Sequence, residues 1–511
     1  MIFPSILYMK VEDMIEEETI DAPAYFVDLN LDQIVEAIIC GREEYNLRPL
    51  YYKPLKDVDS ILFRQEIMRD LECANLLAQV NSFAQKMHTM RAHLVQVSKL
   101  DNRYQKGSWF LDAVEIYCDA VSCLRKTLAS ANLESRGLSS FREYLNNYIS
   151  SDSFNSLLSG MKELKTDLSM IKYCLLMRSD TVTIRRYESE IDYSAAIQRT
   201  FERFRHGAVK DYLIKLEDKP EMNQVEANVL EIVAQLFPDT FAGLEDYCQR
   251  KADYLDIKIA MFDREIQFYI AYLEYVATFR KSGLEFCYPR VTNTSKEIYD
   301  RQGFDAALAL KLIGENSRVV TNDFHLEKSE RVFVISGPNQ GGKTTFARTF
   351  GQLHFMAALG CMVPGTEAKL FLMDGLFTHF EREETVKDLR GKLEGDLIRI
   401  RSILEQATTN SIVIINEIFT STTLQDAVFL SKEIMRKIVG LGALCVWVTF
   451  VDELASFSKE TVSMMSAVVP GNPALRTYKI LRSPANGLSY AISIAEKYQL
   501  TYGNLRKRIK L

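Results

Sequence analysis

Residues 331–345, RVFVISGPNQGGKTT, decide the fold of this chain. The apolar run 332–335 predicts a buried parallel strand, because β-branched and aromatic side chains suit a strand that is covered on both faces. A glycine-rich turn follows, and then the run FARTFGQLHFMAAL (346–359), which predicts a helix that stops at Gly360. The stretch therefore has the form GxxxxGKT between a strand and a helix, which is the context that gives this motif its meaning.

The turn carries the chemistry expected of a nucleoside triphosphate site. Its glycines let successive backbone N–H groups surround a phosphate, and the helix N-terminus adds positive potential. Lys343 is predicted to reach the outer phosphates and Thr344 to offer its hydroxyl to Mg²⁺. A glycine-rich turn without chemistry is the alternative, and the flanking strand and helix argue against it. The predicted nucleotide-binding residues are Gly337, Pro338, Asn339, Gln340, Gly341, Gly342, Lys343, Thr344 and Thr345, and the expected cofactors are ATP and Mg²⁺.

Length, charge and cysteine usage limit the class of protein. A chain of 511 residues is long enough for about three domains, each with its own core. The net charge of −6 argues against an overall basic nucleic-acid binder but leaves room for a local basic face. Nine scattered cysteines without a CxxC pair predict reduced residues of a cytoplasmic protein, not a disulfide frame or zinc site. We expect neither a signal peptide nor a membrane partner, because no apolar run has the required form or length.

Three long helices are predicted before the phosphate loop. In each, apolar residues recur at alternating steps of four and three, which is typical of helices that pack lengthwise. The last would run about 40 Å. The pattern alone leaves open whether these helices are rigid levers or the core of an ordinary bundle. The apolar stripes are Leu76, Val80, Phe83, Met87, Met90, Leu94 and Val97; Leu157, Met161, Leu164, Leu168, Ile171 and Leu175; and Leu255, Ile259, Phe262, Ile266, Tyr269, Leu273 and Val276.

The sequence pattern is no longer helical between the second and third apolar stripes. The run TVTIRRY (181–187) alternates like a strand and opens a segment with several basic residues. Such residues can face a phosphate backbone. Interleaved acidic residues favour the other interpretation, a solvated surface of mixed charge. The basic residues are Arg185, Arg186, Arg199, Arg203, Arg205, Lys210 and Lys215.

After Pro289 a linker-like stretch (290–303) leads into a short helix and then into alternating strands and helices, as an α/β sheet requires. Strands are predicted at 412–415 and 444–448, and helices around 393–404 and 430–438. The run IVIINE (412–417) resembles a Walker B strand. We interpret Asn416 as a ligand to Mg²⁺ through water, weakened because an amide lacks the charge of a carboxylate. Glu417 is the predicted general base, and an exposed acid without function is the alternative.

From about residue 320 onward, the sequence resembles the ATPase domain of the MutS mismatch-repair family, which is related to ABC-type ATPases. The matching phrases are Asn322-Asp323, ISGPNQGGKTTFAR (335–348), MVPGTEAKLFLMDGLFTHF (362–380), the Walker B strand and LSYAISIAEKYQL (488–500). Upstream, YYKPLKDVDSILFRQEIMRDLE (51–72) resembles the start of the family's helical core. On this resemblance Asn322 joins the predicted nucleotide-binding residues, and the three stripes and the interrupting segment correspond to the levers and clamp.

The resemblance implies an α + α/β fold: a long-helix core, lever and clamp region, followed by an ABC-type P-loop ATPase domain with a C-terminal helix-turn-helix. The expected domains are an N-terminal segment (1–50), the helical core, lever and clamp (51–290, with a clamp-like insertion at about 180–250), the ATPase domain (291–485) and a helix-turn-helix for dimerisation (486–511). Only about 50 residues precede the core, and they contain no Phe-x-Glu phrase. Direct reading of mismatches is therefore not expected.

The sequence departs from the family pattern at four places, which together include seven residues. Asn416 stands for the Walker B aspartate, Phe419, Thr420 and Ser421 for a Gly-Arg-Gly loop, Gly391 and Lys392 for the Ser-Thr that reaches the partner subunit's γ-phosphate, and Phe450 for a histidine. A phenylalanine cannot donate to phosphate. Lys392 is interpreted either as positive charge supplied to the partner or as a solvated lysine at a helix start.

The family implies a homodimer that encloses two ATP molecules. Our first hypothesis is a slow, Mg²⁺-dependent ATPase whose nucleotide state moves the levers and clamp on DNA of distinctive structure. The alternative is a nucleotide-dependent switch that acts on a ribosome or a protein partner, as in another branch of the family. That branch carries a further nuclease-like domain, which is not found before Leu511, so this alternative ranks lower. A third hypothesis is a nucleotide binder that hardly turns over.

Overall fold

The chain forms two compact units. The computed structural model describes residues 5–10, 21–178, 181–189, 196–197, 199–200, 222–381, 391–469, 472–485 and 499–508. Unit 1 comprises Met1–Ala74, Leu133–Ser139 and Arg264–Leu511, and unit 2 comprises Asn75–Asn132 and Ser140–Asp263. The sequence-based domain boundaries stay predictions.

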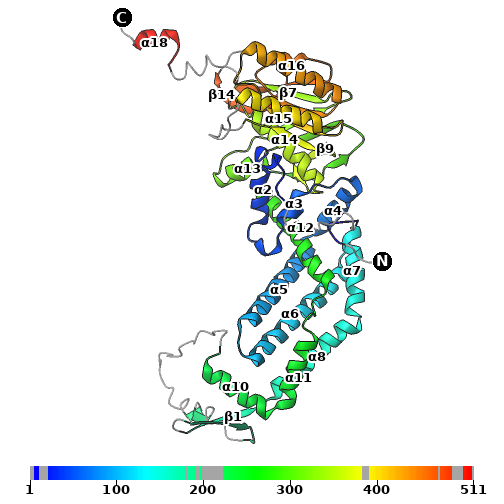
Figure 1. Cartoon of the computed structure of the whole chain (residues 1–511), viewed down its shortest axis with the longest axis vertical. Helices are drawn as coiled ribbons and strands as arrows, with labels where there is room; N and C mark the ends of the chain where they lie inside the picture. Colours follow the sequence, from blue (N-terminus) through cyan, green and yellow to red (C-terminus); the bar gives the residue numbers. More distant parts are fainter. Residues whose placement is uncertain are drawn as a thin grey trace. The chain divides into compact units, whose positions relative to one another are not determined.

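Unit 1 contains a six-stranded sheet, to which β7 and β14 belong (Figure 1). Its strand order is β10-β11-β12-β7-β13-β14, and all neighbours are parallel except β13 and β14. Every residue of β7, β11 and β12 is buried, which explains their uninterrupted apolar runs and confirms the three predicted strands. The strands are β7 (Val332–Ser336), β10 (Leu376–His379), β11 (Ile412–Asn416), β12 (Leu444–Val448), β13 (Thr461–Val469) and β14 (Asn472–Arg482).

Helices cover both faces of this sheet. On one face of the sheet, Val413 of β11 and Trp447 of β12 pack with apolar residues of α15 (Lys392–Gln406) and α16 (Leu424–Leu441) in one buried cluster. Ile414 points to the opposite face, where it meets Gly351 of α14 (Lys343–Ala358). The predicted helices around residues 346–359, 393–404 and 430–438 are thus confirmed.

A smaller sheet is built from strands on both sides of the phosphate loop in the chain, and it corrects one prediction. Residues 290–303 are not a linker, because they form β4 and β5 of a four-stranded sheet with the order β4-β9-β5-β6. The short helix expected after them is α13 (Ala306–Gly314). The strands are β4 (Arg290–Thr292), β5 (Ile298–Gly303), β6 (Asn322–Leu326) and β9 (Glu367–Phe371), and a separate pair joins β3 (Phe286–Cys287) to β8 (Val363–Pro364).

The N-terminal part of unit 1 packs against the C-terminal end of α14, the helix that follows the phosphate loop. Residues 5–8 are buried, and the fully buried Arg64 donates to Leu7 O at 3.0 Å and to Leu359 O at 2.9 Å. This arginine therefore joins the first residues of the chain to the C-terminal end of α14. The helical elements here are α1 (Tyr25–Asp28), α2 (Leu31–Ile39), η2 (Glu43–Tyr45), α3 (Arg48–Tyr52) and α4 (Val58–Leu71).

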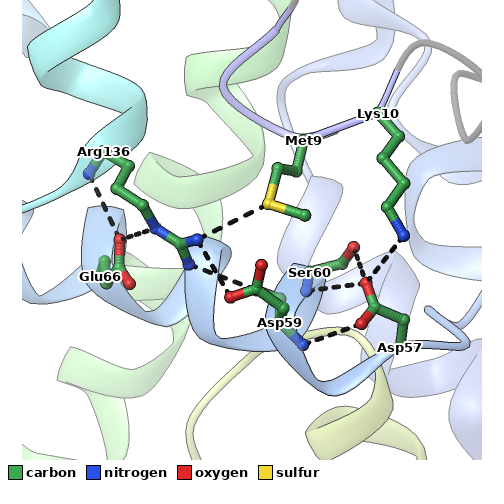
Figure 2. Close-up of polar contacts among 7 residues, drawn as sticks. All are labelled: Met9, Lys10, Asp57, Asp59, Ser60, Glu66 and Arg136. Atoms are coloured by element: carbon green, nitrogen blue, oxygen red, sulfur yellow. Dashed lines mark hydrogen bonds and ion pairs between the residues drawn. The ribbon is translucent and has the colours of Figure 1, made fainter.

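Polar side chains fix the first turns of α4 (Figure 2). Asp57 caps the helix, because its carboxylate accepts from Asp59 N and Ser60 N at 3.1 Å each. Arg136, from the short segment of unit 1 between residues 133 and 139, lies 3.0 Å from both Glu66 and Asp59. These exposed contacts attach that segment to α4.

In its described residues, unit 2 is a helical bundle with an antiparallel pair of strands. The first apolar stripe lies on α5 as predicted, and the third lies on α12 except for Leu255, which precedes the helix. The predicted second stripe extends beyond its helix, because α8 ends at Met170 and Leu175 belongs to β1. β1 pairs with β2, the strand predicted from the run 181–187. Three helices, α5, α7 and α12, contribute residues to both units. The elements are α5 (Ala74–Lys99), α6 (Arg103–Ser130), α7 (Arg136–Ile149), α8 (Asp152–Met170), β1 (Tyr173–Arg178), β2 (Thr181–Arg186), α10 (Gln224–Leu236), α11 (Pro238–Arg250) and α12 (Ile257–Lys281).

The C-terminal prediction is only partly covered. Beyond η3 (Asp452–Ser456) and the β13–β14 pair, the structure describes α18 (Tyr502–Arg508). Residues 486–498, which hold most of the predicted helix-turn-helix, lie outside the described residues. Within the described part of the chain, no helix has both the length and the apolar character needed to cross a membrane.

Candidate nucleotide-binding site

The loop between β7 and α14 has the backbone that the motif predicts. Gly337 and Gly342 have φ values of +116° and +93°, which are strained for any residue with a side chain. At Gly341 the limit is space, since a Cβ atom would lie 2.1 Å from Ser466 Oγ and 2.9 Å from Pro338 O. The glycines are therefore required both by conformation and by close packing.

Lys343 is folded onto this loop. Its ammonium donates to Gly337 O at 2.8 Å, to Asn339 Oδ1 at 3.2 Å and to Pro338 O at 3.4 Å. It also lies 3.7 Å from the Glu417 carboxylate. Burial lowers the pKa of Lys343, and the negative charge of Glu417 opposes this shift. The lysine is thus a buried cation whose partners all belong to the predicted site.

Thr344 and Asn416 bring the first turn of α14 to the end of β11. The Thr344 hydroxyl donates to Asn416 Oδ1 at 2.9 Å, and Asn416 is largely buried. Two oxygen atoms of the kind that Mg²⁺ binds therefore converge next to the phosphate loop. The donor set fits the metal, but it lacks the negative charge that a carboxylate would add.

Glu417 follows directly after β11 in a left-handed conformation. Its φ of +54° costs roughly 1–2 kcal/mol for a residue with a side chain. Its amide donates to Val448 O at 3.0 Å, which holds the turn against the end of β12. The strained turn places the Glu417 carboxylate beside Lys343 instead of continuing the strand.

A buried pair supports the residues after Glu417. Asp396 on α15 accepts from Phe419 N at 3.4 Å, and His379 Nε2 of β10 lies 3.2 Å from its other oxygen. Burial acts to raise the pKa of Asp396, but His379 and the Phe419 amide outweigh it and lower that pKa. Phe419 itself is buried and has a φ of +64°, so it occupies a fixed turn.

Asn322 connects strands in this structure. Its side-chain amide donates to Tyr478 O at 3.1 Å, and its Oδ1 accepts from Ile480 N at 2.8 Å. These bonds join β6 to β14, and Tyr478 O lies 3.5 Å from the position that a Cβ atom of Gly342 would occupy. The direct nucleotide contact that the resemblance implied for Asn322 stays a prediction.

Two further residues contact the phosphate loop but belong to no sequence motif from which this contact could be predicted. Ser466 of β13 is buried and donates its hydroxyl hydrogen to Gly341 O at 2.7 Å. Arg476 of β14 donates its Nε–H to Asn339 O at 3.3 Å. Both come from strands more than a hundred residues after the loop, so only the folded sheet brings them there.

The residues aligned with those that reach a partner subunit, Gly391 and Lys392, lie at the start of α15, and Phe450 follows β12. Gly391 is the N-terminal cap residue of α15, and Lys392 forms an ion pair with Glu381. Phe450 is 48% exposed and can donate nothing to a phosphate. The role of Lys392 toward a second subunit stays a prediction, and residues 382–390 lie outside the described residues.

The basic segment of unit 2 is only partly described. Arg186 donates to Leu236 O at 3.0 Å, and its guanidinium lies 4.9 Å from the Phe237 ring, so it helps to hold β2 against α10. Arg185 and Arg199 are exposed. Four further basic residues of the prediction, Arg203, Arg205, Lys210 and Lys215, lie outside the described residues.

Known protein families match both the long-helix part and the sheet-containing part of this chain. Residues 333–503, which include the glycine-rich loop and β11, match the family model described as MutS domain V. Residues 56–282, which include the long helices, match the model described as MutS2 N-terminal domain. The chain belongs to the MutS family.

Individual MutS relatives match over part of their length. The chain is 31% identical over 183 residues to Endonuclease MutS2 of Thermus thermophilus, covering 35% of this chain and 24% of that protein. It is 27% identical over 217 residues to DNA mismatch repair protein MutS of Orientia tsutsugamushi, covering 41% and 24%. For MutS of Rickettsia felis the values are 25% over 275 residues, 53% and 30%. The chain therefore spans about a quarter to a third of the length of these relatives.

Proposed function

We propose that this MutS-family chain is a Mg²⁺-dependent ATPase that binds DNA. One observation carries the proposal: two contacts connect the phosphate loop to the end of β11. Thr344 meets Asn416 at 2.9 Å, and Lys343 meets Glu417 at 3.7 Å. A phosphate-binding residue, a metal-binding pair and a candidate base therefore occupy one place in the fold.

Lys343 and Glu417 would change partners when a triphosphate binds. Lys343 now donates to loop carbonyls, and an incoming phosphate offers it full negative charge in place of neutral oxygens. The ammonium of Lys343 then attracts Glu417 less strongly. The Glu417 carboxylate becomes free to accept a proton from the attacking water. General base catalysis of this kind contributes about 10²–10⁴ in rate.

Thr344 and Asn416 would hold Mg²⁺, the threonine directly and the asparagine through water. When bound, Mg²⁺ neutralises charge on the phosphates and on the transition state. Asn416 accepts a hydrogen bond from metal-bound water without contributing charge, and charge-assisted bonds are roughly twice as strong as neutral ones. We therefore propose that hydrolysis is slow.

The proposal for DNA rests on the family. Relatives that share the ATPase domain are named as mismatch-repair proteins and as an endonuclease. By analogy with the family, we propose that two copies of this chain enclose ATP and that α5 and α12 act as levers. DNA of distinctive structure, such as a four-way junction or a flap, is the proposed ligand.

Fluorescence anisotropy tests this function directly. Labelled duplex, four-way and flap DNA are titrated with the purified chain, with and without ATP and Mg²⁺. We expect saturable binding that ATP changes and that prefers one of the branched DNAs. A chain that binds none of them in either state refutes the DNA proposal. In the same preparation, co-sedimentation with ribosomes would instead favour the switch that acts on a ribosome.

A further inference from the structure

Arg476 brings a second positive charge to the phosphate loop. It lies on β14, and its Nε–H donates to the backbone carbonyl of Asn339 at 3.3 Å. The side chain of the same asparagine accepts from Lys343 at 3.2 Å. One loop residue is thus contacted by two cations, one from the helix after the loop and one from an antiparallel edge strand.

Two like charges at one residue are unfavourable unless an anion lies between or beside them. Lys343 and Arg476 both donate to Asn339, so their positive charges lie near each other. The Glu417 carboxylate lies 3.7 Å from Lys343, and Asp452 adds a weaker attraction. A polyphosphate at the loop would place negative charge beside both cations, and a guanidinium presents planar, paired donors that match phosphate oxygens.

Three described residues near the loop add no free positive charge to it. Asn416 is neutral, Phe450 has no donor, and Lys392 is paired with Glu381. Arg476 reaches the loop from within the same chain, through the β13–β14 pair that also places Ser466 on Gly341. The sheet therefore positions this arginine without help from a second subunit.

We propose that Arg476 is a further nucleotide-binding residue, whose guanidinium binds the outer phosphates and makes the site prefer a triphosphate to a diphosphate. This inference rests on the proposed ATP site and adds to it a residue that no part of the GxxxxGKT motif includes. Lys343 would contact the phosphates from the helix side and Arg476 from the strand side.

The test compares ATP with ADP. A non-hydrolysable ATP analogue and ADP are titrated into the wild-type chain and into Arg476→Gln, Arg476→Lys and Ser466→Ala variants by calorimetry. Ser466→Ala is the matched control, because it removes a neutral hydrogen bond to the neighbouring loop carbonyl and leaves the charge of the site unchanged. Thermal melting of each variant checks that the fold is intact.

Arg476→Gln is expected to weaken the ATP analogue about tenfold or more and ADP much less, since bonds to charged groups are the stronger ones. Arg476→Lys, which keeps charge and loses the planar fork, should fall between. Ser466→Ala should affect both nucleotides alike. If Arg476→Gln changes both nucleotides equally, or neither, the arginine merely braces the loop and the inference is wrong. A wild-type chain that binds neither nucleotide overturns the proposed ATP site and this inference together.

Should Arg476→Gln fail to fold, the lysine variant decides, because it retains the charge on β14. The expected result is then a reduced preference for the ATP analogue over ADP. An unchanged preference would overturn the inference.

Discussion

Thr344 Oγ1 and Asn416 Oδ1 share a hydrogen bond of 2.9 Å that links the start of α14 to the end of β11. An aspartate at position 416 would face the same hydroxyl with a full negative charge. The structure therefore isolates one chemical difference, amide against carboxylate, at the place where Mg²⁺ is expected.

Replacing Asn416 with aspartate should strengthen Mg²⁺ binding and raise ATP turnover by about tenfold, because a charged acceptor binds metal-bound water more strongly than an amide. Asn416→Ala, which removes the acceptor altogether, should lower turnover. Steady-state hydrolysis measured over a Mg²⁺ titration checks both. Equal turnover in the aspartate and asparagine forms would show that Asn416 does not act on the metal.

Glu417→Gln should reduce hydrolysis by about 10²–10⁴ while ATP binding persists, because the amide cannot accept the proton of water. Lys343→Ala should abolish hydrolysis through loss of binding. Single-turnover kinetics combined with a binding assay separate the two effects. Hydrolysis that continues unchanged in Glu417→Gln would remove this residue from its assigned role.

Glu265 should make stability depend on pH. Ser5 Oγ and Ile6 N donate to its carboxylate at 2.6 and 2.9 Å, and burial raises its pKa from the ordinary 4.5 to about 7. The folded chain then keeps a proton that the unfolded chain releases, so this contribution is complete below pH 4.5 and is lost as pH rises to 7. The loss amounts to about 3 kcal/mol at most.

Glu265→Gln tests this titration, because glutamine keeps the shape and cannot ionise. Denaturant unfolding of both proteins at pH 5, 6, 7 and 8 should show the wild type losing stability relative to the variant up to about pH 7. A difference between the two proteins that is constant over this range would contradict the predicted titration.

Two arginines in unit 1 should differ in their effect on stability. Arg64 is fully buried and donates to the carbonyls of Leu7 and Leu359, so Arg64→Ala should cost about 3 kcal/mol by leaving buried acceptors unpaired. Arg136 makes exposed ion pairs with Glu66 and Asp59, and Arg136→Ala should cost about 1 kcal/mol or less (Figure 2). Chemical denaturation measures both, and equal losses would contradict this comparison.

The sequence predicts the central sheet well because its strands are buried on both faces. β7, β11 and β12 are therefore continuous apolar runs, and the loop and Glu417 follow from their positions at strand ends. Residues 290–303 could not be predicted in this way. The strand β5 combines exposed polar residues with a buried Asp300, so its apolar residues do not alternate regularly. Only pairing with β6 and β9 makes it a strand.

Other features depend on contacts that a single stretch cannot reveal. Leu175 continues the spacing of the α8 stripe, but pairing with Ile184 of β2 places it in a strand. The 28-residue helix α6 does carry a regular apolar spacing at Leu111, Val114 and Cys118, so its signal was present in the sequence. Ser466 and Arg476 reach the loop through strand order alone, which local pattern does not encode.

The central claim is that Lys343, Thr344, Asn416 and Glu417 form one ATP site. Calorimetric titration of ATP with Mg²⁺ into the wild-type chain and into Lys343→Ala tests it most directly. The account predicts saturable binding by the wild type and a loss of about 100-fold or more in the variant, because the buried ammonium is the main phosphate contact. Equal binding by the two proteins, or none by the wild type, would contradict it.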